Sequence, residues 1–147
     1  MFRFRLQSVL DFRKQREEQS LAEFADIKRR LDHEMERLCG MMEDREKMTA
    51  HVNTIGRGDI RPTDIALHTA YIRRLKEQEQ RQQAVIKTVE HELERKRTVL
   101  VETVKQRKII ENIRERRFEE YKAEVHERER KELDERGIIN ANKGGGR

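Results

Sequence analysis

No proline or glycine interrupts residues 63–136, which read TDIALHTAYIRRLKEQEQRQQAVIKTVEHELERKRTVLVETVKQRKIIENIRERRFEEYKAEVHERERKELDER. At about 1.5 Å per residue, an α-helix of this length runs for roughly 110 Å. Helices in globular domains usually have only about three or four turns. The sequence therefore predicts a fold organised around one very long helix, from about residue 63 to about 136, and a function that suits a rod.

The composition favours helices that pack along a narrow seam. Of the 147 residues, 43% are charged and 34% are hydrophobic, and Pro62 is the single proline. So few apolar side chains cannot build a wide core, but they can fill the interface of a coiled coil. Disorder would also fit this much charge. We reject it because the apolar residues recur at regular intervals.

The first third of the chain has an average apolar spacing of 3.5 residues, which is typical of a left-handed coiled coil. The apolar positions of this predicted seam are Leu6, Leu10, Phe24, Ile27, Leu31, Leu38, Met41, Met48, Val52 and Ile55. The same spacing also passes through Arg13, Glu17, Ser20, Glu34 and Arg45. The pattern predicts a first helix over about residues 3–55. We interpret the gap at 13–20 as a place where the seam loosens or faces something else.

The segment 56–62, GRGDIRP, is the only strong turn signal before the C-terminus. After it, the predicted seam of the second helix passes through Ile72, Leu75, Glu79, Gln82, Ile86, Val89, Leu93, Lys96, Leu100, Thr103, Arg107 and Ile110. Beyond Ile110 the apolar residues leave this register, which indicates a stutter or a change of partner. Gly137 is expected to end the helix, and residues 138–147 to form a flexible tail.

A short connection between two long helices predicts that they lie antiparallel. We therefore expect an all-α fold, an antiparallel two-helix coiled-coil hairpin that forms one domain over residues 1–137. The second helix is longer and should overhang at the termini end, over residues 116–136. The overhang carries Phe118, Tyr121 and Val125 without an internal partner. Such an apolar stripe is either unused or a docking face, and we interpret it as a docking face.

The sequence carries no pattern typical of catalysis. It has no phosphate-binding glycine loop, and its histidines lack the spacing of metal ligands on one helix face. We expect no enzyme activity, no cofactor and no metal. Cys39 is the single cysteine, which suits a reducing cytoplasm. No stretch resembles a secretory signal or a membrane span. Acidic residues flank each short basic run, so nucleic acid is not an expected partner.

Two blocks of the sequence resemble a known family. Residues 2–13, FRFRLQSVLDFR, are similar to the N-terminal signature of the FliJ family of the bacterial flagellar export apparatus. Residues 97–136 are similar to its C-terminal half in order and spacing, through KQRK at 105–108, Glu111, ERR at 115–117, Tyr121, Glu129 and LDE at 133–135. The middle of the chain matches only in length and heptad character. Where family members can show aromatic residues there, this chain has methionine and charge.

The resemblance implies an antiparallel coiled-coil stalk of the type III protein export system. Such a protein binds the hexameric export ATPase and promotes its assembly and activity. It also contacts the membrane export gate protein and export chaperones. It would be a monomer alone, cytoplasmic, and peripherally associated with the cell membrane at the flagellar base, where it would serve flagellum biogenesis, motility and chemotaxis. The alternatives are a stalk of a virulence secretion system and a generic coiled-coil scaffold.

Carried onto this sequence, the resemblance implies two sets of contact residues. The expected contacts with the ATPase ring are Leu6, Leu10, Arg13, Arg116, Arg117, Phe118 and Tyr121. The expected contacts with the export gate, near the hairpin loop, are Met41, Met48, Tyr71 and Leu75. Ordinary seam packing is the alternative explanation for the leucines and methionines, because one helix stripe cannot face both its partner helix and a second protein. For the arginines the alternative is that they are solvated surface charges.

Overall fold

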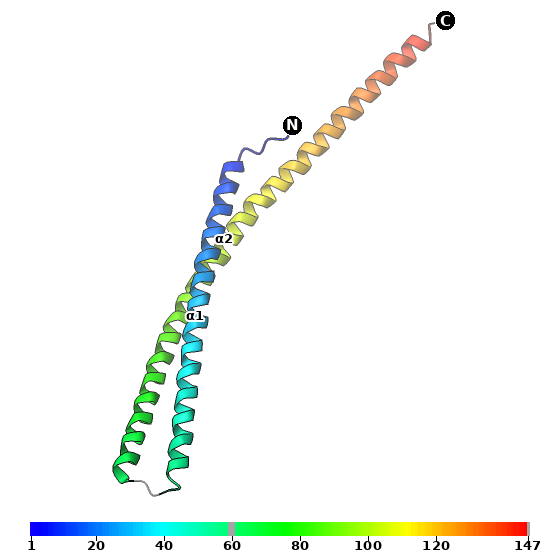
Figure 1. Cartoon of the computed structure of the whole chain (residues 1–147). Helices are drawn as coiled ribbons and strands as arrows, with labels where there is room; N and C mark the ends of the chain where they lie inside the picture. The colour runs from blue at the N-terminus through cyan, green and yellow to red at the C-terminus, as the bar shows by residue number, and fades with distance from the viewer. Residues whose placement is uncertain (59–60, 147) are drawn as a thin grey trace. The chain divides into compact units, whose positions relative to one another are not determined.

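The computed structural model describes residues 1–58 and 61–146, and these form two long helices (Figure 1). Helix α1 spans Gln7–Ile55 and helix α2 spans Pro62–Gly144. The described residues include no strand, and the two helices pack against each other as a helical hairpin, so the predicted all-α fold is confirmed. Pro62 occupies the first position of α2, where its missing N–H breaks no helical hydrogen bond.

The predicted helix ends need two corrections. Helix α1 begins at Gln7 rather than near residue 3, after a turn in which the Gln7 amide donates to the Phe4 carbonyl at 3.1 Å. Helix α2 passes through Gly137 and ends at Gly144. A glycine ends a helix efficiently when it adopts a positive φ, and no described residue does so. Residues 138–144 are thus helical. Asp59 and Ile60 of the predicted turn lie outside the described residues.

The chain divides into two compact units. Unit 1 comprises Met1–Glu18 and Glu102–Arg147, and unit 2 comprises Gln19–Val101. Each unit therefore contains a part of both helices. A single domain over residues 1–137 stays a prediction. No described helix has an apolar stretch long enough to cross a membrane.

In unit 2 the two helices meet along the predicted seam. Leu31, Ile86 and Val89 form its core, and Ile27, Leu38 and Leu93 pack against them. Residues late in α1 meet residues early in α2, as an antiparallel pair requires. Every predicted seam position in both units except Leu6 is buried or half-buried. The heptad pattern thus identified the packed face of both helices.

Polar side chains on the seam of unit 2 meet polar partners on the facing helix. The Arg45 guanidinium lies 2.7 Å from the Glu79 carboxylate, and both side chains are largely covered. The Gln82 amide donates to the Glu34 carbonyl oxygen at 2.9 Å and to its carboxylate. The Lys96 ammonium pairs with Glu23 at 3.0 Å. These pairs give partners to polar groups, whose burial without a hydrogen bond or ion pair would cost free energy.

In unit 1, polar pairs between the helices also occupy the part of the predicted gap at 13–20 that belongs to this unit. Arg13 donates to the side-chain oxygen of Gln106, and Arg107 pairs with both Glu17 and Glu111. The hydrogen bond to Glu17 raises the pKa of Arg107 above its ordinary value. The interpretation that the seam loosens here was wrong, because these charged residues meet partners on α2 instead of facing away from it.

Candidate interaction surfaces

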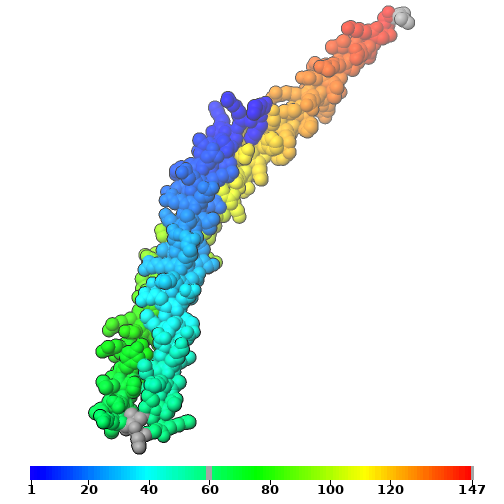
Figure 2. Space-filling view, in the orientation of Figure 1, coloured from blue at the N-terminus to red at the C-terminus, as the bar shows by residue number. Residues whose placement is uncertain are grey.

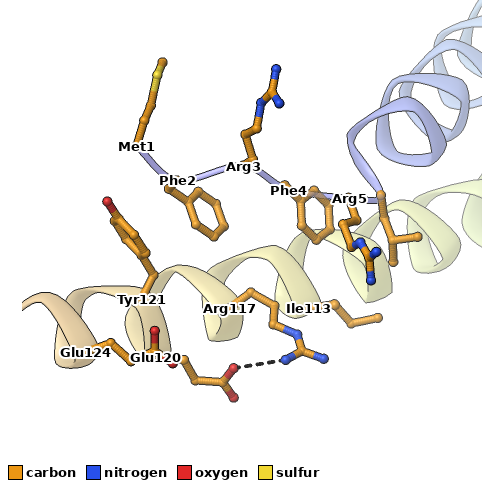
Figure 3. A pocket seen from close by; sticks show the side chains of 11 residues that line it. Met1, Phe2, Arg3, Phe4, Arg5, Ile113, Arg117, Glu120, Tyr121 and Glu124 are labelled. Atoms are coloured by element: carbon orange, nitrogen blue, oxygen red, sulfur yellow. Dashed lines mark hydrogen bonds and ion pairs between the residues drawn. The ribbon is translucent and has the colours of Figure 1, made fainter.

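The N-terminal segment Met1–Leu6 lies against α2 in unit 1. The Phe2 ring contacts the Phe118 ring edge-on, with centroids 5.2 Å apart, and the Tyr121 ring at 5.6 Å. Aromatic pairs at such distances and tilts are favourable beyond the area that they bury. Figure 3 shows the Phe2 and Phe4 rings directed toward the helix, whereas Arg3 points away from it. Phe2 therefore anchors the segment.

This contact corrects the predicted unpartnered stripe. Phe118 and Tyr121 have an internal partner in Phe2, although Phe118 remains 42% exposed. Val125 is the last half-buried residue of α2, and every described residue after it is exposed. In Figure 2 no other segment covers the visible face of this last part of α2, coloured orange to red. The uncovered end of the helix is therefore residues 126–144.

Two grooves flank the N-terminal segment. The larger, of about 530 Å³, is lined by residues of Met1–Leu6 and, from α2, by Ile113, Arg117, Glu120, Tyr121 and Glu124. Arg117 pairs with Glu120 at 3.3 Å within this lining. The second groove, of about 450 Å³, is lined by Phe2, Arg3, Phe4, Arg5, Gln7 and Arg114. The first groove thus carries both charges, whereas the second is lined by cations without an acid.

All residues predicted to contact an ATPase ring belong to unit 1, but they differ in accessibility. Leu6, Arg116, Arg117 and Phe118 are exposed, and Tyr121 is half-buried. Leu10 is fully buried in the seam, so its side chain offers no surface to a partner. Arg13 is half-buried and bonded to Gln106. Leu10 and Arg13 therefore hold unit 1 together.

The residues predicted to contact an export gate all belong to unit 2. Met41 and Met48 are half-buried on the seam, and Leu75 is 8% exposed there. Tyr71 is 46% exposed. It is therefore the one member of this set with a largely free side chain. In the same unit the His51 and His68 rings meet edge-on at 5.8 Å.

Sequence reasoning did not assign any role to Phe2, Arg3, Phe4, Arg5 or Arg114. The signal for the first four was present as the alternation Phe-Arg-Phe-Arg, because residues in an extended segment alternate between two sides. A search for apolar residues at helical spacing does not detect this alternation. Arg114 carries no comparable signal, since arginines are frequent along the whole of α2.

The chemistry of these surfaces is that of binding. In the described part of the chain, no group of three or more histidine, cysteine or acidic side chains could hold a metal ion. The grooves offer guanidinium donors beside aromatic rings. Arginine pairs with carboxylates through two parallel hydrogen bonds and stacks on aromatic groups. The arrangement thus suits recognition of another macromolecule.

The comparison with protein families gives one match, which covers nearly the whole chain. The family model described as flagellar FliJ protein matches residues 1–146. No curated protein and no solved structure matches the chain. The match spans both units and the N-terminal segment as well as both helices.

Proposed function

We propose, from the premise that this chain belongs to the FliJ family and is a component of the flagellar export apparatus, that it is the stalk of the export ATPase. In this role it binds the hexameric ATPase and promotes its activity without catalysing a reaction itself. It also links the ATPase to the membrane export gate and to export chaperones. The family match over residues 1–146 is the observation that carries this proposal.

The ATPase contact is assigned to unit 1. Its accessible candidates are Leu6, Arg116, Arg117, Phe118 and Tyr121, which combine exposed apolar and cationic groups. Protein interfaces are rich in such arginine and aromatic anchors. Leu10 and Arg13 support this surface indirectly, because they position α1 against α2.

The gate contact is assigned to unit 2, with Tyr71 as its exposed anchor. Tyrosine combines a large apolar ring with a hydroxyl group, so it is frequent at the centre of interfaces. Met41, Met48 and Leu75 lie on the seam. They maintain the helix pair on which Tyr71 stands. Through this contact the protein is held at the inner face of the membrane, in the cytoplasm.

The test is a reconstituted assay with the cognate export ATPase. We expect the wild-type chain to bind the ATPase and to raise its turnover and its oligomerisation. The double variant Arg116→Glu/Arg117→Glu should bind at least about tenfold more weakly, since charge complementarity across an interface is then reversed. The matched control is Arg73→Glu/Arg74→Glu, another pair of exposed neighbouring arginines on α2, in unit 2. If wild-type protein neither associates with the ATPase nor changes its rate, the proposal is wrong.

A further inference from the structure

The groove on the arginine-lined side of the N-terminal segment contains none of the residues that the resemblance implied as contacts with the ATPase ring or the export gate. Three arginines line it, Arg3, Arg5 and Arg114. Two aromatic side chains, Phe2 and Phe4, complete most of its wall. None of the three arginines has a hydrogen bond or ion pair with another described residue, whereas nearby Arg117 is neutralised by Glu120. The lining of this groove therefore combines three cations and no acid with apolar surface, and Arg3 and Arg5 also line the first groove, which contains Glu120 and Glu124.

Local structure holds these arginines in place. Phe2 is fixed between Phe118 and Tyr121. The turn at Phe4–Gln7 then connects the segment to α1. Arg3 thus lies between the Phe2 contact and the turn, Arg5 lies within the turn, and Arg114 belongs to α2. A binding site preorganised in this way loses less conformational entropy when a partner binds.

We infer that this groove binds an acidic segment of the export ATPase, one that presents carboxylates next to aliphatic side chains. The inference rests on the proposed function and names the chemistry of the partner surface. Carboxylates match the fork of each guanidinium and supply the charge that the lining lacks. Aliphatic groups match the half-buried side chains of Phe2 and Phe4.

The packing of the aromatic rings favours this partner over two others. Nucleic-acid binding would need a free ring face on which a base could stack. The Phe2 ring is instead occupied by two other rings, and Phe4 is half-buried. Membrane binding would need apolar side chains that project into lipid. Figure 3 shows both phenylalanine rings directed toward the helix.

The decisive experiment compares two triple variants of the full chain for binding to the cognate ATPase. The test variant is Arg3→Glu/Arg5→Glu/Arg114→Glu. The control is Arg74→Glu/Arg95→Glu/Arg97→Glu, which makes the same change of net charge at exposed arginines of α2 in unit 2. We expect the test variant to bind at least about 30-fold more weakly, as for loss of charged pairs at an interface. The control should stay within about threefold of wild type.

Further measurements separate the possible failures. Circular dichroism checks that both variants keep their helix content, and Arg3→Lys/Arg5→Lys/Arg114→Lys should recover part of the affinity because it restores charge without the guanidinium fork. If the wild type binds the ATPase and the test variant binds equally well, this inference is overturned while the proposed function stands. The inference is also overturned if the test variant keeps its ATPase affinity but loses binding to anionic phospholipid vesicles or single-stranded DNA. If the wild type does not bind the ATPase, both proposals fail.

Discussion

Two regions of α2 show how differently one helix can be stabilised. Between Leu75 and Val89, in unit 2, a buried residue recurs at every third or fourth position. From residue 126 to 144, in unit 1, every side chain is exposed. Both regions are continuous α-helix without a proline. The difference teaches that the helical state itself does not depend on a packed face along its whole length.

In the first part of the exposed region, ion pairs within the helix take the place of packing. Lys131 pairs with Glu127 at 2.9 Å and Arg128 with Glu124 at 3.6 Å, each one turn apart. Pairs with this spacing stabilise an exposed helix weakly. The buried region instead gains from apolar burial and from pairs across the seam. Mutation, salt and pH should therefore affect the two regions differently.

The largest expected difference comes from removing an apolar side chain. Leu31→Ala should lower the free energy of unfolding by about 2–4 kcal/mol, because it leaves a cavity beside Ile86 and Val89. Leu133→Ala, at a residue that is 67% exposed, should change it by less than about 0.5 kcal/mol. Urea denaturation of both variants measures this. Equal losses of unfolding free energy in the two variants would contradict the proposed difference between the two regions.

A smaller effect is expected from breaking a polar pair of the seam. Arg45→Ala should cost about 1–3 kcal/mol, since the Glu79 side chain is only 10% exposed and would lose its partner. The double variant Arg45→Ala/Glu79→Ala should recover part of this loss. Arg117→Ala breaks an exposed pair with Glu120 and should cost less than about 0.5 kcal/mol. The prediction would be contradicted if double-mutant cycles gave the same coupling free energy for the Arg45–Glu79 pair as for the Arg117–Glu120 pair.

Salt should act mainly on the exposed region. At about 1 M salt the screening length falls to about 3 Å, which weakens solvent-exposed ion pairs. We expect amide hydrogen exchange over residues 126–144 to become several-fold faster between about 0.05 and 1 M sodium chloride, whereas residues 75–89 should change little. Exchange measured by mass spectrometry reports both regions in one sample. A uniform response would show that their stabilisation is the same.

The smallest effect is expected from acid at Glu127. The hydrogen bond from Lys131 lowers the pKa of this carboxyl below its ordinary value. A lowered pKa in the folded state favours the carboxylate, so its stabilisation is present above the ordinary pKa and is lost as the pH falls through the lowered one. Glu127→Gln should therefore reduce local helix content slightly at pH 7. The variant should also lack the decrease in helix content that protonation of Glu127 causes in the wild type at acid pH. Backbone NMR shifts of residues 126–131 measure the change.

The seam could be predicted from the sequence because helix packing imposes a simple period. Positions 3.5 residues apart on average lie on one side of a helix, and even charged members such as Glu79 and Lys96 are covered there. The role of the charged members could not be predicted in the same way. Whether Arg13 and Glu17 loosen the seam or pair across it depends on which residues of α2 face them.

Two other features could not be predicted, because one depends on the backbone conformation of a glycine and the other on a contact between residues far apart in the chain. Gly137 stops a helix only if its backbone adopts a positive φ, and here the helix continues at a cost of about 1 kcal/mol. The contact of Phe2 with Phe118 joins residues that are far apart in the chain and that share no helical period. This is why the site around the N-terminal segment was recognised only once its structure was known.

The charged seam pairs also predict that α1 is a poor partner for a second α1 in a parallel, in-register arrangement. In a parallel, in-register dimer formed through α1, each seam residue would face its own counterpart, so Arg45 would meet Arg45 and Glu34 would meet Glu34. Like charges held at such short range repel. On α2, by contrast, Glu79 and Gln82 lie at the matching positions. The polar seam therefore favours pairing of α1 with α2 over parallel, in-register pairing of α1 with a second α1.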